Sequence, residues 1–144
     1  MTPACRFRQI VNVVNLSTPL GLVLVATGTR RPGLRRGPDG LLVAGGYRLP
    51  LPIARAFTCG NVVLSRGTSG ELLDDSRLLR HEGRHATQYA YCLGPVMIVM
   101  YLACAGVSMV LCGDHSSFNP FERLAGLDDG GYRRKPLRRL RRRT

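Results

Sequence analysis

Three residues near the middle of this 144-residue chain have the types and the spacing of a metal site. His81 and His85 are four positions apart, so on a helix both imidazoles lie on one face and can bind a single ion. Glu82 follows His81 directly, and a carboxylate there can take a proton from a water molecule that the ion activates. The pentapeptide HEGRH therefore predicts a zinc site with Glu82 as the catalytic base.

A third protein ligand is needed, because a catalytic zinc ion takes three protein ligands and keeps one open position. A histidine six residues after His85 would complete one known arrangement, but Tyr91 stands there. Glu122 is the downstream carboxylate that opens a segment of helical character, and we predict it as the third ligand. His115 and Asp114, both in a predicted loop, stay open as alternatives.

Two helices must carry these ligands. The first is expected from about residue 77 to residue 91, with an N-terminal cap provided by one of the residues 74–76. The second is expected at 121–127, with Pro120 at its start and Asn119 as its cap.

Strands are expected on the N-terminal side of the motif. Two short apolar runs, 41–44 and 47–49, flank a Gly-Gly pair, which is typical of a β-hairpin. The run 56–64 is expected to form a further strand, with Gly60 and Asn61 marking a bulge or a close backbone approach. The sequence thus predicts an α+β fold class with a short antiparallel sheet, a motif helix and one or two strongly apolar helices.

The apolar helices are expected in two segments, 10–26 and 93–112. Polar residues interrupt the first segment and no signal-peptide cleavage site follows it, so we expect a retained helix, kinked or broken near Pro19, in or against a membrane. A buried helix of a soluble protein is the alternative. The second segment has no charged residue over about 20 positions, which makes it a transmembrane candidate.

A straight membrane crossing by 93–112 conflicts with the predicted metal site. It would separate His85 from Glu122 by roughly 30 Å, whereas the ligands of one ion lie about 2 Å from it. A bend at Gly106, a long buried or interfacial helix, or a site within the membrane would each resolve the conflict. The polar residues around the motif disfavour the last, so we expect a site at the membrane surface with 93–112 dipping into lipid.

The net charge of +12 is concentrated at the C-terminal end. Residues 133–144 carry eight cations and no anion, which predicts a disordered basic tail that contacts anionic lipid headgroups. No nucleic-acid-binding motif and no interleaved aromatic residue accompanies the tail, so nucleic acid is not an expected partner.

Residues 80–88 (RHEGRHATQ), followed by Leu-Gly-Pro at 93–95 and a long apolar stretch, resemble a group of small bacterial membrane-associated zincins of the gluzincin type. In that group HExxHxxQ precedes Leu-Gly-Pro and an apolar segment, and Glu-x-x-Ala follows, here at 122–125. The resemblance covers roughly residues 56–132. It implies a zincin-like fold with Glu82 as base and one zinc ion on His81, His85 and Glu122.

The resemblance also implies a substrate site and reveals a departure. Gly60, Asn61 and Val62 resemble the edge strand along which gluzincins bind an extended substrate. Many relatives carry Asp after Glu-x-x-Ala, whereas this chain has Gly126, which predicts that a second acceptor for a ligating histidine is missing. The transition-state donor of the family, a Tyr or His, has four unranked counterparts: Tyr89, Tyr91, His115 and Tyr132.

Together these features predict a single zincin-like, membrane-associated domain at 1–132 that hydrolyses peptide bonds with one zinc ion, and the tail at 133–144. The expected partners are a peptide or protein substrate and membrane lipid. The expected location is a bacterial inner membrane with the C-terminal tail in the cytoplasm. The alternative is a catalytically inactive zincin-like small membrane protein with an interaction or regulatory role.

Overall fold

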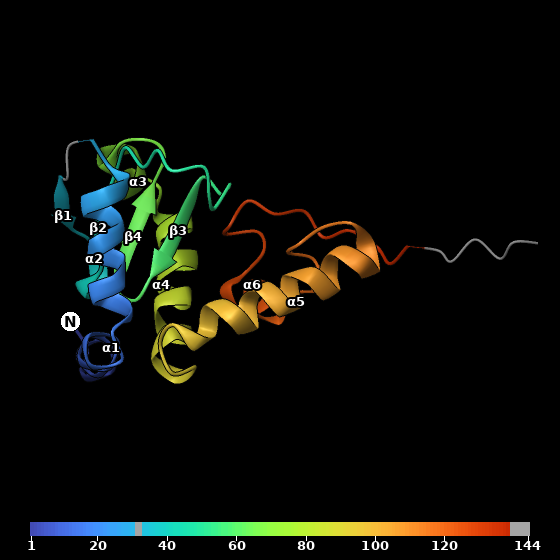
Figure 1. Ribbon diagram of the computed structural model, residues 1–144, viewed down its shortest axis with the longest axis horizontal. Helices are drawn as coiled ribbons and strands as arrows, with labels where there is room; N and C mark the ends of the chain where they lie inside the picture. The colour runs from blue at the N-terminus through green and yellow to red at the C-terminus, as the bar shows by residue number, and fades with distance from the viewer. Residues whose placement is uncertain (31–32, 139–144) are drawn as a thin grey trace, which may run out of the picture.

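The computed structural model describes residues 1–30 and 33–138, and the fold class is α+β, as predicted (Figure 1). The helices are α1 (Pro3–Val14), α2 (Ser17–Gly28), α3 (Ser69–Asp74), α4 (Ser76–Tyr91), α5 (Val96–Cys112) and α6 (Pro120–Ala125). The strands are β1 (Leu34–Arg36), β2 (Leu42–Ala44), β3 (Ala56–Cys59) and β4 (Val62–Ser65), and a short 3-10 helix spans Pro38–Gly40.

The four described strands form one mixed sheet in the order β1-β2-β4-β3. β1 with β2 and β3 with β4 are antiparallel, but β2 and β4 run parallel. The prediction of a short antiparallel sheet is therefore wrong for the central pair of strands, β2 and β4. The predicted hairpin between 41–44 and 47–49 does not form, because the chain after β2 continues across the sheet end, where Tyr47 bridges to Thr29 and bonds to Ser65.

The run 56–64, predicted as one strand, is two strands joined by a tight turn at Gly60 and Asn61. Gly60 has φ of 63°, and its Cα packs against the backbone of Thr18, so a side chain has no room there. β4 lies inside the sheet and β3 lies at its edge. The prediction that Gly60, Asn61 and Val62 form an edge strand is therefore wrong, and β3 takes that place.

Helices cover both faces of the sheet, with α2 in front of it and α4 behind it in Figure 1. On one face Val25 of α2 shares a buried cluster with Val62, and on the other Leu79 of α4 shares one with Val63. β4 is buried at every position, which explains its uninterrupted apolar run. This packing holds α4 in place and sets the direction in which the motif residues point.

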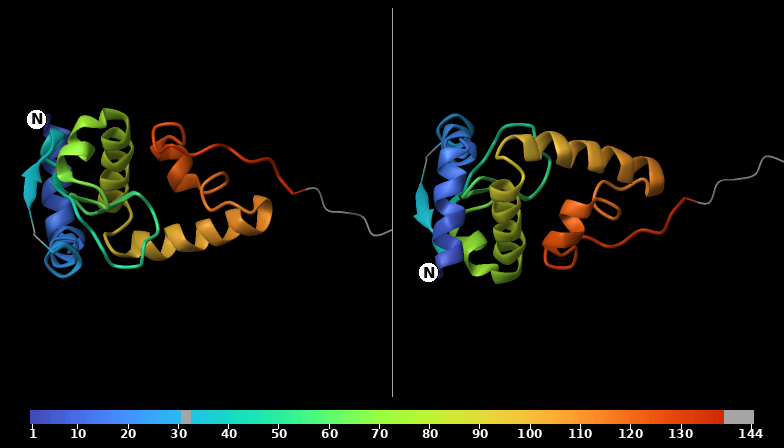
Figure 2. Two further views of the ribbon diagram at one scale, coloured as in Figure 1. Left: turned by 90° about the horizontal axis from the view of Figure 1, so that it is seen from above. Right: turned by 90° about the horizontal axis from the view of Figure 1, so that it is seen from below.

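α5 and α6 form an arm that extends from the sheet (Figure 2). The chain turns by 117° between α4 and α5, runs along α5, and returns through residues 113–119 to place α6 beside α4. α5 is continuous through Gly106, so the bend expected there does not form. The chain bends instead at 92–95, before α5 begins. This return path brings Glu122 back to the motif helix.

The first apolar segment is also broken. α1 and α2 meet at 71° across Asn15 and Leu16, just before Pro19, which lies in the first turn of α2. Within residues 1–30 and 33–138, no single helix has both the length and the apolar character to cross a bilayer; two bent pairs, α1 with α2 and α4 with α5, meet those criteria when each pair is counted together.

The predicted basic tail is held in place over its first residues. Residues 133–138 have no helix or strand, but Lys135 donates its backbone N–H to Ser117 Oγ and Arg138 donates its own to Leu111 O, both at 2.8 Å. The expectation of disorder from residue 133 onward is therefore corrected for 133–138. The rest of the predicted tail, 139–144, lies outside the described residues.

Candidate metal centre

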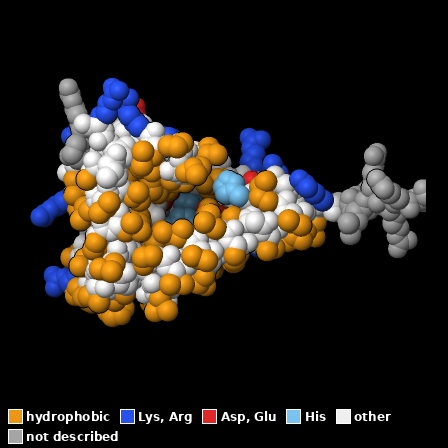
Figure 3. Space-filling model, viewed as in Figure 1, with side chains coloured by type: hydrophobic (Ala, Val, Ile, Leu, Met, Phe, Trp, Pro, Cys, Tyr) orange, Lys and Arg blue, Asp and Glu red, His pale blue; other side chains and the backbone are white. Residues whose placement is uncertain are grey.

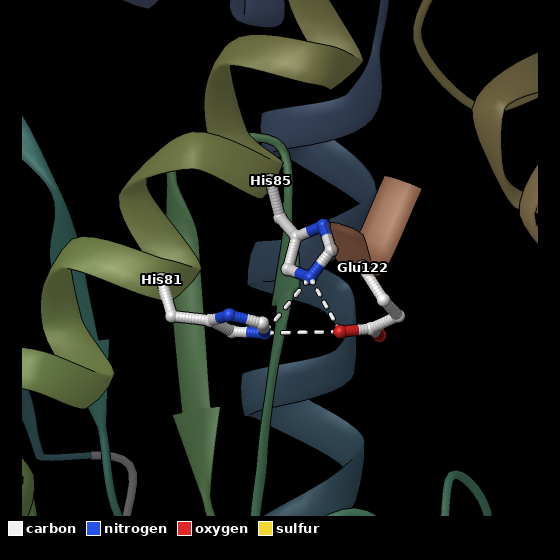
Figure 4. A group of neighbouring side chains, drawn as sticks. All are labelled: His81, His85 and Glu122. Carbon is white, nitrogen blue, oxygen red and sulfur yellow. Dashed lines mark hydrogen bonds and ion pairs between the residues drawn. The ribbon is translucent and has the colours of Figure 1, made fainter. Parts of the chain in front are cut away.

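The three predicted metal ligands converge on one point (Figure 4). His81 and His85 lie one turn apart on α4, and their Nε2 atoms are 3.1 Å apart. Glu122 of α6 directs Oε2 between them, 3.2 Å from Nε2 of His81 and 3.6 Å from Nε2 of His85. All three residues are buried, with exposed fractions of 2%, 7% and 2%.

Helix caps explain where each ligand lies. α4 begins after Asp75, whose carboxylate accepts a hydrogen bond from Leu78 N at 3.0 Å. α6 begins after Asn119, whose side chain accepts one from Phe121 N at 3.0 Å. Both caps are among those predicted, although α6 ends at Ala125, earlier than expected.

The spacing of the three ligand atoms is compatible with one small metal ion, for which zinc gives the reference distances. Zinc lies about 2.0 to 2.1 Å from its nitrogen and oxygen ligands, so tetrahedral angles put the ligand atoms about 3.3 Å from one another. The observed separations of 3.1, 3.2 and 3.6 Å agree with that value. One ion can therefore contact all three atoms and still keep a fourth position open.

Hydrogen bonds fix which ring nitrogens are available. His81 Nδ1 lies 3.0 Å from the carbonyl oxygen of Gly126, which can only accept, so Nδ1 carries the proton. His85 Nδ1 lies 2.8 Å from Gln88 Oε1, and the Gln88 amide orientation is set by its donation to Phe121 O. In each neutral ring Nε2 therefore carries a lone pair directed at the shared point, as metal-binding histidines require.

With the ring protons on Nδ1, both Nε2 atoms and Glu122 Oε2 are hydrogen-bond acceptors that face one another. Glu122 Oε2 is buried and accepts no hydrogen bond from any described residue. Burial raises the pKa of Glu122, but the nearby His81 and His85 and the Tyr101 hydroxyl together outweigh burial and hold the pKa far below its usual range. Burial lowers the pKa of His85, but Glu122, Glu82 and Gln88 together outweigh burial, so the pKa is raised. A buried carboxylate beside two imidazole nitrogens is a set of groups that could hold a metal ion.

Glu82 occupies the place expected of the base. Its side chain is buried next to the ligands, and Thr58 Oγ1 donates a hydrogen bond to its Oε2 at 2.6 Å. Burial raises the pKa of Glu82 above its ordinary value, although the His85 charge and the Thr58 hydrogen bond act in the opposite direction. Thr58 belongs to the edge strand β3, so this bond links the base to the sheet.

Residues 126–132 form a loop, here called the strap, that packs on His81. Gly126 supplies the carbonyl acceptor for Nδ1, so the acceptor predicted to be missing at this position is present as a backbone group. A Cβ atom on Gly130 would lie 2.6 Å from Cε1 of His81, so only glycine leaves room for the ring. The strap therefore orients the first ligand from two sides.

Charged groups attach the strap to α4. Arg84 Nη1 donates to the carbonyl oxygen of Ala125 at 2.6 Å and to Asp129 Oδ2 at 2.9 Å. The other carboxylate oxygen of Asp129 lies 3.4 Å from Arg77 Nε and 3.6 Å from an Arg80 guanidinium nitrogen. One strap carboxylate thus binds three arginines on successive turns of α4.

A pocket of about 210 Å³ opens beside the ligands. His81 and Glu82 form part of its wall, together with Ala56 of the edge strand and with Gly130 and Tyr132 of the strap. Figure 3 shows a hollow on this face with histidine atoms at its floor. The pocket therefore gives solvent a path to the buried side chains of His81 and Glu82.

The two alternative ligands lie outside the cluster. Asp114 is held in its loop by hydrogen bonds from Ser116 Oγ and from the backbone and hydroxyl of Ser117. His115 is exposed, and its ring packs edge-on against Tyr132 with centroids 5.3 Å apart. Glu122 is the ligand that reaches the histidines.

The four proposed transition-state donors are now distinguishable. Tyr89 is buried in a core cluster beside Cys59, and Tyr91 is 77% exposed at the end of α4. Tyr132 lines the pocket, and its ring centroid lies 5.9 Å from that of His81. His115 packs behind that tyrosine and is not among the residues lining the pocket.

Sequence reasoning missed three supporting residues. The hydroxyl of Tyr101 on α5 donates a hydrogen bond to Glu122 Oε1, Thr58 donates one to Glu82, and Gly130 makes room for His81. A tyrosine in an otherwise apolar helix was the available signal for Tyr101. No local pattern marked Thr58 or Gly130, because their roles depend on contacts between distant segments.

Comparisons of this chain with protein-family models, with curated proteins and with solved structures find no match.

Proposed function

We propose that this chain is a zinc-dependent metallopeptidase with His81, His85 and Glu122 as its metal ligands. One observation carries the proposal: two imidazole lone pairs and an unpartnered carboxylate oxygen, all buried, face one point at zinc-ligand spacing. Such an arrangement is electrostatically unfavourable without a cation or added protons. The likeness to gluzincins in sequence supports the same ligand set.

A zinc ion held there would polarise a water molecule and the carbonyl group of a bound peptide. Glu82 accepts the proton from the attacking water and passes it to the departing amine. Thr58 holds one oxygen of Glu82 by a hydrogen bond, which keeps the carboxylate directed at the pocket it lines. Tyr132, the pocket-lining tyrosine, is the proposed hydrogen-bond donor to the substrate oxyanion.

The proposed substrate is a peptide in extended conformation, bound along β3. β3 and β4 are antiparallel, and the backbone N–H of Arg66 donates to the carbonyl oxygen of Arg55. Hydrogen-bonded and non-hydrogen-bonded residue pairs alternate along an antiparallel ladder. Ala56, the next residue, is therefore in a non-hydrogen-bonded pair, and its backbone N–H and C=O point away from β4. Ala56 also lines the pocket. An added strand on this edge would place a peptide bond beside Glu82.

Replacement of the base tests the proposal. Glu82→Gln should retain zinc and lose hydrolysis of a mixture of unstructured peptides by about a hundredfold or more, whereas His81→Ala should lose both. Wild-type protein that binds zinc but cleaves no peptide would favour the alternative of an inactive zincin-like protein. Hydrolysis that survives in Glu82→Gln would refute the assigned base.

A further inference from the structure

The two bent helix pairs share an unusual feature at their breaks. The first elbow, between α1 and α2, contains Leu16 at φ of 68°, and the second elbow, between α4 and α5, contains Leu93 at φ of 58°. Both leucines are strongly exposed, at 64% and 76%. Each bend therefore contains a leucine with positive φ and a strongly exposed side chain.

Neither the positive φ of these leucines nor the exposure of their side chains is favourable in water. The left-handed region disfavours residues with a Cβ atom and is usually occupied by glycine or asparagine. An exposed leucine side chain also contributes no burial to folding. A leucine at this kind of position is favourable where the side chain can enter an apolar medium.

The two elbows lie against each other. Asn15 Nδ2 donates a hydrogen bond to Tyr89 O at 3.1 Å. A Cβ atom on Gly94 would lie 2.6 Å from Asn15 O, so the two backbones are in direct contact. Leu16 and Leu93 each adjoin this contact, and both elbows lie at the lower side of the molecule in Figure 1.

Apolar side chains surround this contact. Val14 on the first elbow is 75% exposed and Tyr91 on the second is 77% exposed. Figure 3 shows hydrophobic side chains continuing along the lower edge from α1 to α5. On α5 the most exposed large apolar residues are Val99, Leu102, Val107 and Val110, each more than half exposed.

The distribution of charged residues around this apolar surface favours binding to a lipid bilayer. The chain has 21% charged residues, yet 9–29 and 91–113 contain none. Cations lie at both ends of the apolar surface: Arg6 is exposed on α1, and Arg138 bonds to Leu111 near the end of α5. An apolar surface with cations at its ends complements a bilayer with anionic headgroups.

We propose that the paired elbows are a membrane-insertion site, with Leu16 and Leu93 entering the hydrocarbon of one leaflet. α4 rises from the second elbow, and His85 lies about 9 Å along its axis from Tyr91. Insertion of the elbows therefore places the metal cluster near headgroup depth, with the pocket further along α4 toward its N-terminal end. This assignment does not depend on whether the cluster binds zinc.

Asparagine substitutions separate membrane insertion from folding. Asn is well tolerated at positive φ, so the double variant Leu16→Asn/Leu93→Asn should melt at or above the wild-type temperature. Ile53→Asn is the matched control, because Ile53 is 84% exposed on the segment between β2 and β3. That segment runs along the upper side of the molecule in Figure 1, away from the elbows. Flotation with purely zwitterionic phosphatidylcholine vesicles removes any contribution of the basic tail.

The double variant is expected to partition into these vesicles at least tenfold less than wild type, while Ile53→Asn partitions like wild type. Equal partitioning of the double variant, or no partitioning of wild type, would overturn the proposal. A wild-type dimer in vesicle-free solution that becomes monomeric in the double variant would assign the surface to a second copy instead. Zinc content measured on the same samples keeps a failure here distinct from a failure of the metal centre.

Discussion

Arg84, which directly precedes the second histidine of the HExxH motif, binds Asp129 on the strap through an Nη1–Oδ2 contact of 2.9 Å. The same nitrogen donates to Ala125 O, immediately before the glycine whose carbonyl oxygen orients His81. The motif therefore supplies two ligands, and through Arg84 it also holds the segment that fixes the first of them.

Arg84→Ala should weaken zinc binding by about tenfold, because the strap carbonyl that orients His81 loses its anchor. The unfolding free energy should fall only slightly, since the pair is partly exposed. Zinc affinity from chelator competition and a urea titration check both effects. Arg80→Ala, which removes a 3.6 Å contact with Asp129 and no bond to Ala125, is the control. Equal affinities in wild type and Arg84→Ala would contradict the assignment.

Gly130→Ala should reduce zinc affinity by about tenfold or more, because the new Cβ atom would displace the His81 ring from a contact of 2.6 Å. The same chelator competition measures the effect. Gly106→Ala is a suitable control, since a Cβ there meets no atom within 4 Å. An unaltered zinc affinity in Gly130→Ala would show that the strap does not fix the ring.

Tyr101→Phe removes the hydroxyl that donates to Glu122 Oε1. The buried carboxylate then loses a partner, so zinc-free protein should be destabilised by about 1 to 3 kcal/mol, and zinc affinity should fall about tenfold. Urea unfolding with and without zinc separates the two effects. Tyr91→Phe changes an exposed hydroxyl and should match wild type; a Tyr101→Phe protein that also matches wild type would contradict the role of this bond.

The lowered pKa of Asp114 predicts that the protein loses stability in acid. Burial raises its pKa, but hydrogen bonds from Ser117 and Ser116 outweigh burial and lower the pKa to about 2. Because the folded pKa is below the unfolded one, Asp114 contributes its full stability above pH about 4 and loses it as pH falls toward 2. Urea midpoints of zinc-free protein between pH 2 and 5 should fall less steeply for Asp114→Asn than for wild type. An unchanged slope in the variant would exclude Asp114 as a source of the acid sensitivity.

Local signals in the sequence predicted the helix with the motif, a cap for it among residues 74–76, and the short helix with Glu122, because caps and helical spacing act over a few residues. The parallel pairing of β2 with β4 was not predictable in this way, since it depends on residues 45–55 crossing the sheet end. A Gly-Gly pair that indicates a hairpin also suits such a crossing.

The candidate site likewise combines residues that local sequence predicted with residues that it did not. His81, His85 and Glu122 were predicted from residue type and spacing, and the structure brings them together. Thr58, Tyr101 and Gly130 act on that site from the sheet edge, the arm and the strap. Their roles arise from packing between segments distant in sequence, so no local pattern could reveal them.

The zinc content of purified full-length protein and two variants tests the central claim most directly. Elemental analysis should find one zinc ion per chain in wild type and in His115→Ala, and a large loss of zinc in Glu122→Ala. A wild-type protein without stoichiometric zinc, or a Glu122→Ala protein with unchanged zinc, would contradict the proposed metal centre.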